Sequence, residues 1–255
     1  MTTLLTLTGF TPVQFGLVLA VVFVAGLVRG FAGFALSALV MASLASFIAP
    51  VELIGVCFLL ELAATLLMVR GGFRDGNFGI ALGLVIGSAI GAPVGLYLTN
   101  TLPVETSKMI ALLLILGLAL LQLLKVRATF LATKPGLYVS GFTAGVATGL
   151  ASVGGMVVAL YVLARDRASR EMRGSLVQFL AMSTMMSALY LVWYGMFTRE
   201  VLMRGLVFAL PCIAGVLLGQ ALFTPRFEGY YKPFCLCLLM LLAGAGLFRL
   251  VSGQA

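Results

Sequence analysis

Val28-Arg29-Gly30-Phe31-Ala32-Gly33-Phe34 breaks a long apolar stretch near the N-terminus, and Thr148-Gly149-Leu150-Ala151-Ser152-Val153-Gly154-Gly155 breaks a similar stretch in the second half. A continuous helix from Val13 to Ala49 would be about 55 Å long at about 1.5 Å per residue, far more than one membrane crossing requires. Glycines allow a chain to bend or to expose its backbone. Each interruption therefore predicts a hairpin of two shorter helices.

Composition excludes a soluble globular domain. Hydrophobic residues make up 62% of the chain, charged residues only 9%, and the mean hydropathy is +1.18. Apolar runs of roughly 20 residues, the length of one crossing, recur from Val13 to Leu250. We therefore expect an all-α polytopic membrane protein.

The two halves of the chain follow the same order of segments. Each has one broken hairpin, and three apolar spans follow it: 51–69, 77–98 and 107–124 in the first half, and 175–194, 205–223 and 234–251 in the second. The expected organisation is a first transmembrane repeat at 1–124, a cytoplasmic linker at 125–134 and a second transmembrane repeat at 135–255. Such internal duplication is characteristic of secondary transporters.

Positive charge decides how the hairpins cross the membrane. If each hairpin returns to the side from which it entered, loops 70–76, 125–134, 165–174 and 224–233 share one face and hold most of the 16 Lys and Arg residues. If each broken segment crosses once, these residues divide almost evenly. The positive-inside rule favours the first arrangement. It predicts two inverted repeats in a bacterial-type cytoplasmic (inner) membrane, with both termini periplasmic or extracellular.

The first interruption offers groups for an anion. Arg29 lies within the membrane, where an unpaired guanidinium is costly, so it should face a cavity, an anion or a carboxylate. The helix that begins near Ala35 would direct its N-terminus into the same space. Helix N-termini favour negative charge, so this end would add to the attraction for an anion. Gly30 and Gly33 allow close backbone approach, and Ser37 adds a hydroxyl.

The second interruption supplies the counterpart. Thr148 and Ser152 carry hydroxyls, while Gly154 and Gly155 open the backbone at the start of a helix near Met156. Any one of these glycines is as well explained by helix packing, since small residues let membrane helices approach closely. Two interruptions at matching places in two repeats favour a binding site between the hairpin tips.

Three further residues are candidates. Glu61, near the middle of a span, is a candidate proton carrier, a counter-ion for Arg29 or part of a cation site, and a purely structural pair with Arg29 is the alternative. Arg173 directly precedes a span that carries Gln178 one turn further on. Both are candidate anion contacts, and an interfacial anchor is the other interpretation of Arg173.

The chain lacks the residues that several classes of function require. The chain has no histidine, which disfavours metal and Ser/His sites, and it lacks the phosphate-binding pattern G-x-x-x-x-G-K-[ST]. We expect no enzyme, no metal and no nucleic-acid partner. No cofactor is expected beyond a coupling proton or sodium ion.

The glycine-rich tip Gly30-Phe31-Ala32-Gly33, the pair Ala49-Pro50, the region 145–155 and Arg173-Gly174-Ser175 at a helix start resemble the TauE/SafE family of sulfite exporters and related anion permeases. The resemblance covers nearly the whole chain. It implies import or export of a small sulfur-containing or organic anion, such as sulfite or a sulfonate, coupled to an ion gradient.

The resulting hypothesis is a secondary transporter that holds a small anion between two hairpin tips at the bilayer midplane. Its partners are the lipid bilayer and the anionic substrate. A homo-oligomer is a further possibility at this point. Two alternatives remain at this point: an anion channel built from the same broken helices, and a structural subunit of a membrane complex that transports nothing.

Overall fold

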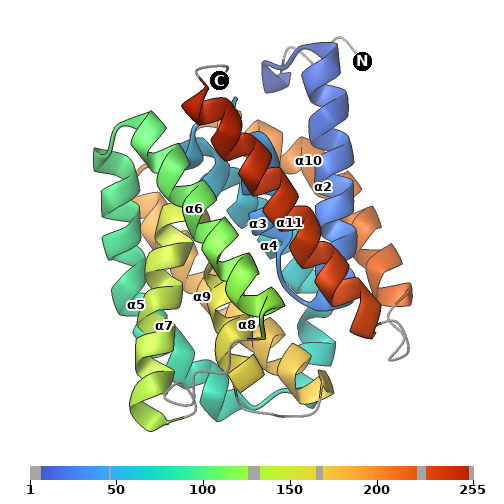
Figure 1. Cartoon of the computed structure of the whole chain (residues 1–255), viewed down its shortest axis with the longest axis vertical. Coiled ribbons are helices and arrows are strands. Elements are labelled where there is room, and N and C mark those ends of the chain that lie inside the picture. The colour runs from blue at the N-terminus through green and yellow to red at the C-terminus, as the bar shows by residue number, and fades with distance from the viewer. Residues whose placement is uncertain (1–6, 46, 126–132, 165–168, 223–227, 253–255) are drawn as a thin grey trace.

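A computed structural model describes residues 7–45, 47–125, 133–164, 169–222 and 228–252. Within these ranges the secondary structure is helical, and no strand is present. Figure 1 shows the arrangement. In chain order the helices are α2 (Pro12–Ala32), α3 (Leu36–Leu44), α4 (Pro50–Asp75), α5 (Phe78–Thr101), α6 (Val104–Leu123), α7 (Lys134–Ala151), α8 (Gly154–Ala164), α9 (Ser169–Trp193), α10 (Arg199–Ala221) and α11 (Glu228–Val251). Most of the expected linker, at 126–132, lies outside the described residues.

The described part of the chain has 7 helices, or parts of helices, that are long and apolar enough to cross a membrane. They come from α2, α4, α5, α6, α9, α10 and α11, and their mean hydropathies range from 1.5 to 2.3. This result confirms the expected polytopic, all-helical class. Helices α3 and α8 are too short to cross a bilayer alone, at 9 and 11 residues.

Both interruptions are narrower than the sequence predicted. Helix α2 continues through Arg29 and Gly30 and ends at Ala32, and Gly33 closes it in the left-handed conformation at φ 84°. Helix α7 continues to Ala151, where Ser152 takes the same conformation at φ 57°. The left-handed φ turns the chain out of each helix at this residue, while the N–H of the residue still bonds to a carbonyl of the last turn.

Contacts between distant residues fix the helix directions. At one end, Arg204 of α10 pairs with Glu52 of α4 at 2.6 Å, and its Nε donates a hydrogen bond to the Thr8 carbonyl at 3.0 Å. Helices α2, α4 and α10 therefore begin at this end, where α11 also ends (Figure 1). We call it the terminal end. At the opposite end, the backbone N–H of Asn77 donates to the hydroxyl of Ser175 at 3.0 Å, which joins the start of α5 to the start of α9.

Two parallel helix pairs form the most intimate contacts. In the pair α5 and α7, a Cβ at Gly91 or Gly145 would collide with backbone atoms of the other helix. The same holds in the pair α2 and α10 for Gly30 and Gly219. These glycines let the helix backbones touch, as small residues commonly do in membrane bundles.

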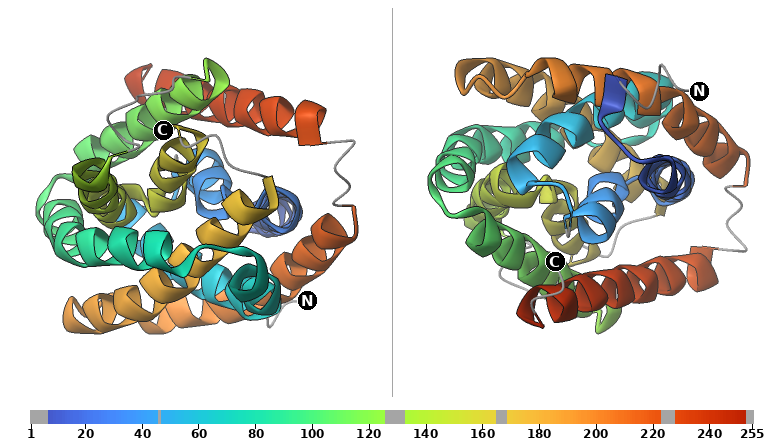
Figure 2. Two further views of the ribbon diagram at one scale, coloured as in Figure 1. Left: turned by 90° about the horizontal axis from the view of Figure 1, so that it is seen from below. Right: turned by 90° about the horizontal axis from the view of Figure 1, so that it is seen from above.

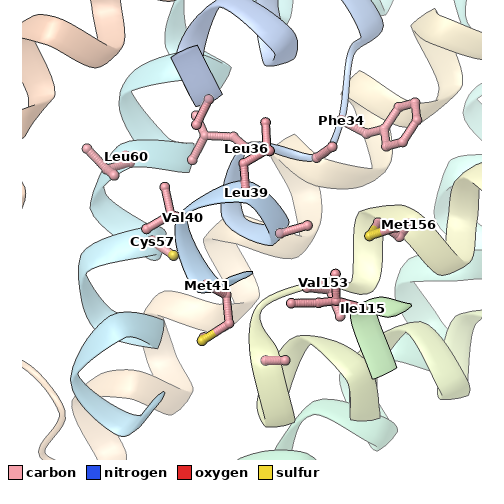
Figure 3. Packing of buried hydrophobic residues seen from close by; sticks show 14 of the residues in the cluster. Phe34, Leu36, Leu39, Val40, Met41, Cys57, Leu60, Ile115, Val153 and Met156 are labelled. Carbon is pink, nitrogen blue, oxygen red and sulfur yellow. The ribbon is translucent and has the colours of Figure 1, made fainter. Parts of the chain in front are cut away.

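The short helix α3 lies at the centre of the molecule. All its residues except Ser43 are buried. Figure 3 shows its apolar side chains beside those of Cys57 and Leu60 from α4 and near Val153 of the second interruption and Met156 of α8. Seen from either end, α3 and α8 lie inside the set of longer helices (Figure 2). The two short helices are thus held where solvent and lipid are excluded.

Candidate functional site

A cavity of ≈ 50 Å³ lies where the two interruptions meet. That volume accommodates a few water molecules or one small anion. Its walls come from the start of α3, from α4, α5 and α7, from the second interruption and from one face of α9. The lining residues are Ala35, Ser37, Ala38, Ile54, Phe58, Glu61, Ala92, Leu96, Thr148, Gly149, Ser152, Val153, Gly154, Gly155, Met156, Leu180, Ser183, Thr184, Ser187 and Leu191.

Two helix N-termini border this cavity. Helix α3 begins after Ala35, whose φ is 74°, and no side chain caps its first amides. Helix α8 begins at Gly154, and the amide of Met156 donates to the Val153 carbonyl at 2.9 Å. Because the first amides of a helix lack partners in the helix itself, such ends attract negatively charged groups.

A buried ion pair lies beside the cavity. The guanidinium Nε of Arg29 is 3.1 Å from Oε2 of Glu61, and Arg29 is 0% exposed. The hydroxyl of Ser37 donates to the other carboxylate oxygen of Glu61 at 2.9 Å. Arg29 also donates to the Gly33 carbonyl and, at 3.5 Å, to the hydroxyl of Thr65. The two charges therefore compensate each other, and only Glu61 of the pair reaches the cavity wall.

The cavity is elongated along the helices. On α4 its lining extends from Glu61 back to Ile54, toward the start of that helix, and on α9 it extends from Leu180 forward to Leu191. The start of α4 and the end of α9 both lie at the terminal end, since Gly55 packs against Met196 and Val201. The cavity therefore extends from the interruptions toward the terminal end of the molecule.

The structure brings together some of the residues singled out in the sequence. Ser37, Glu61, Ser152, Gly154 and Gly155 line the cavity. Arg29 and Gly33 lie directly behind Glu61, joined to it through the Arg29 side chain.

The other three candidates lie elsewhere. Gly30 packs against the backbone of α10. Gln178 is buried beside Gly76, near the end opposite the terminal end. Of Arg173 the structure describes the helical backbone of α9 and no side chain.

Four hydroxyl residues near the site escaped the sequence-based prediction. Thr65 contacts Arg29, while Ser183, Thr184 and Ser187 line the cavity. A signal for them does exist in the sequence, because three hydroxyl side chains within five residues are unusual in the middle of an apolar span. Their spacing also places Ser183 and Ser187 on one helical face.

Membrane-spanning helices around a central cavity, with two interrupted segments at its wall, define a polytopic membrane protein that can enclose a small solute. The chain belongs to the sulfite exporter TauE/SafE family, whose family model matches residues 18–246. This is a family of membrane transporters, so the chain is a membrane transport protein. No curated protein and no solved structure matches the chain.

Proposed function

We propose that the protein is a secondary transporter of a small sulfur-containing or organic anion, such as sulfite or a sulfonate, coupled to an ion gradient. The anion binds in the cavity between the two interruptions. The observation that carries this proposal is the buried pair of Arg29 and Glu61, which places a compensated positive charge beside the uncapped N-terminus of α3 and near the N-terminus of α8.

The ion pair supports a coupling mechanism. While Glu61 is ionised, it neutralises Arg29, and an anion in the cavity faces a carboxylate. When Glu61 takes up a proton, the charge of Arg29 is no longer compensated, and the cavity attracts an anion. Proton binding and anion binding then favour each other, and by linkage each raises the affinity for the other. Anion and proton would therefore move in the same direction.

The contact pattern supports an inverted-repeat arrangement. Helices α2 to α6 correspond in order to α7 to α11, and both α2 and α7 end in a left-handed residue before a short helix. Exchanging each helix for its counterpart converts the parallel pair α5 and α7 into the parallel pair α10 and α2, and the contact of α4 with α10 into that of α9 with α5. Alternating access would follow from movement of one repeat against the other around the cavity.

Uptake of methanesulfonate into proteoliposomes tests the site. We expect uptake by the unmodified protein to rise with an inward proton gradient. Glu61→Gln keeps the size of the side chain but cannot change its charge, so uptake should no longer respond to that gradient. Arg29→Ala removes the positive charge and leaves Glu61 as an uncompensated carboxylate at the cavity wall, so it should reduce uptake at least tenfold.

Glu52→Gln is the matched control, since Glu52 belongs to the ion pair with Arg204 outside the cavity. It should leave the proton response unchanged. The proposed site is wrong if the Arg29 and Glu61 variants both keep unmodified uptake with a normal proton response. Size-exclusion chromatography of each variant separates this outcome from misfolding.

For orientation, we propose a bacterial-type cytoplasmic membrane with the terminal end facing outward, as the charge distribution of the sequence favours. Lys134 begins α7, which runs parallel to α5 and so begins at the opposite end, and it is exposed. In a cysteine-free background, Lys134→Cys should react with an impermeant maleimide only after the cells are opened. Labelling in intact cells would show that the protein has the opposite orientation.

A further inference from the structure

We propose that Ser183 and Ser187 of α9 form the subsite that selects an anion with three oxygens over one with two. This inference rests on the proposed transport function and adds a second wall to the site. The hydroxyls of α9 and the helix N-termini at the interruptions together surround the bound anion.

One face of α9 forms this wall. Leu180, Ser183, Thr184, Ser187 and Leu191 all line the cavity. Their spacing of three or four residues places them on one side of a helix. Ser183 and Ser187 lie one turn, about 6 Å, apart along the helix axis. The leucines close the two ends of this face and leave the hydroxyls between them.

The hydroxyls differ in whether they are already engaged. Thr184 donates to the carbonyl of Leu180 at 2.6 Å, so its hydrogen is committed within the helix. Ser37 is likewise committed to Glu61. Ser183, by contrast, is 7% exposed, and no hydrogen bond joins it to another residue in the described part of the chain. The same is true of the half-buried Ser187.

A buried hydroxyl without a partner is costly, and most such groups in proteins are hydrogen-bonded. Ser183 is more than nine-tenths buried and lines the cavity, and its hydroxyl oxygen is not among the enclosed unpaired atoms, so this hydroxyl is open to whatever fills the cavity. A hydroxyl can donate to an anionic oxygen, and such a charge-assisted hydrogen bond is stronger than a neutral one. The geometry thus points to a bound oxyanion.

The number of oxygens determines which anion uses both walls. A carboxylate presents two coplanar oxygens, which the helix N-termini can satisfy alone. A sulfonate or sulfite presents three oxygens that spread around the sulfur atom, so one of them can face α9 while the others face the interruptions. The α9 hydroxyls therefore add affinity mainly for the three-oxygen group.

Uptake kinetics in proteoliposomes test this subsite, with methanesulfonate and acetate as the paired substrates. We expect Ser183→Ala and Ser187→Ala each to raise the KM for methanesulfonate about tenfold, since one charge-assisted hydrogen bond is lost. The kcat should change little, and the KM for acetate should stay within about twofold. Ser183→Thr keeps the hydroxyl and should restore most of the affinity.

Ser140→Ala is the matched control, because Ser140 is a buried serine of α7 that does not line the cavity. It should leave both KM values unchanged. The subsite is refuted, while transport stands, if both α9 alanine variants keep the unmodified ratio of methanesulfonate to acetate KM. Absence of uptake by the unmodified protein refutes the transport function and the subsite with it. If Ser183→Ala does not yield a monodisperse protein, Ser187→Ala decides the question.

Discussion

The buried pair of Arg29 and Glu61 is held by several further polar groups. Burying one charge without a partner is expensive, and removing one member of a buried pair typically costs about 3–5 kcal/mol. Here Ser37, Thr65 and the Gly33 carbonyl satisfy further polar atoms of the pair. Because Gly33 closes α2, the same guanidinium connects the end of that helix to the wall of the cavity. A proton on Glu61 would therefore be felt at the first interruption.

Ala35 carries the backbone strain of that interruption. Its φ of 74° lies in the left-handed region, where a side chain costs about 1–2 kcal/mol relative to glycine. Ala35→Gly should relieve this strain. Ala38→Gly, three residues further on inside α3, should instead lower the stability of the protein by about 1 kcal/mol. Both changes remove one buried methyl group, so the backbone accounts for the difference.

Thermal unfolding in detergent measures this comparison. We expect the free energies of unfolding of the two variants to differ by about 2 kcal/mol, with Ala35→Gly the more stable. Equal destabilisation by the two changes would mean that Ala35 is not strained.

The sequence points to the charges at the site more strongly than to its hydroxyls. An Arg or Glu within an apolar span needs a partner, so Arg29 and Glu61 attract attention without any structure. A serine or threonine can bond to a carbonyl of its own helix, as Thr148 does to Ala144 at 2.8 Å. A single serine or threonine in a span is therefore a weak signal of a site. Only the cavity distinguishes Ser183 from the other buried hydroxyls.

At the level of helices, the sequence indicated that two apolar stretches are broken but could not place the breaks. The sequence places Gly30 in the first break, yet it lies inside α2 and allows contact with α10. A glycine that bends a chain and a glycine that lets two helices touch look the same in one sequence. Identifying the second kind requires knowing the neighbouring helix.

Helix α5 shows how a proline is accommodated beside the cavity. Pro93 has no N–H, so the Ala89 carbonyl loses its partner within the helix. The hydroxyl of Tyr190 on α9 donates to that carbonyl at 2.8 Å, and the hydroxyl of Tyr194 donates to the Pro93 carbonyl at 3.3 Å. Helix α9 thus stabilises α5 around Pro93, next to the lining residue Ala92. Such replacement bonds are what let membrane helices tolerate proline.

Across the whole molecule, the cavity lies closer to one end than to the other. The lining extends toward the terminal end, along the start of α4 and the end of α9. At the opposite end, Gly76 packs against Gly174, and Asn77 bonds to Ser175. Transport by alternating access requires this asymmetry to reverse. The contact of α4 and α5 with the start of α9 would open, while the part of the cavity near Ile54 and Leu191 would close.

A carrier of the proposed kind exposes one cavity to the two sides of the membrane in turn. Counterflow measures this most directly: proteoliposomes loaded with unlabelled methanesulfonate are diluted into a trace of labelled methanesulfonate, with the membrane potential held at zero by potassium and valinomycin. A carrier with one alternating site should accumulate label above equilibrium before it declines, and Glu61→Gln should retain this overshoot because exchange needs no net proton movement. Uptake that rises to equilibrium without an overshoot would indicate a channel, and no uptake would indicate a structural subunit; either result would contradict the account.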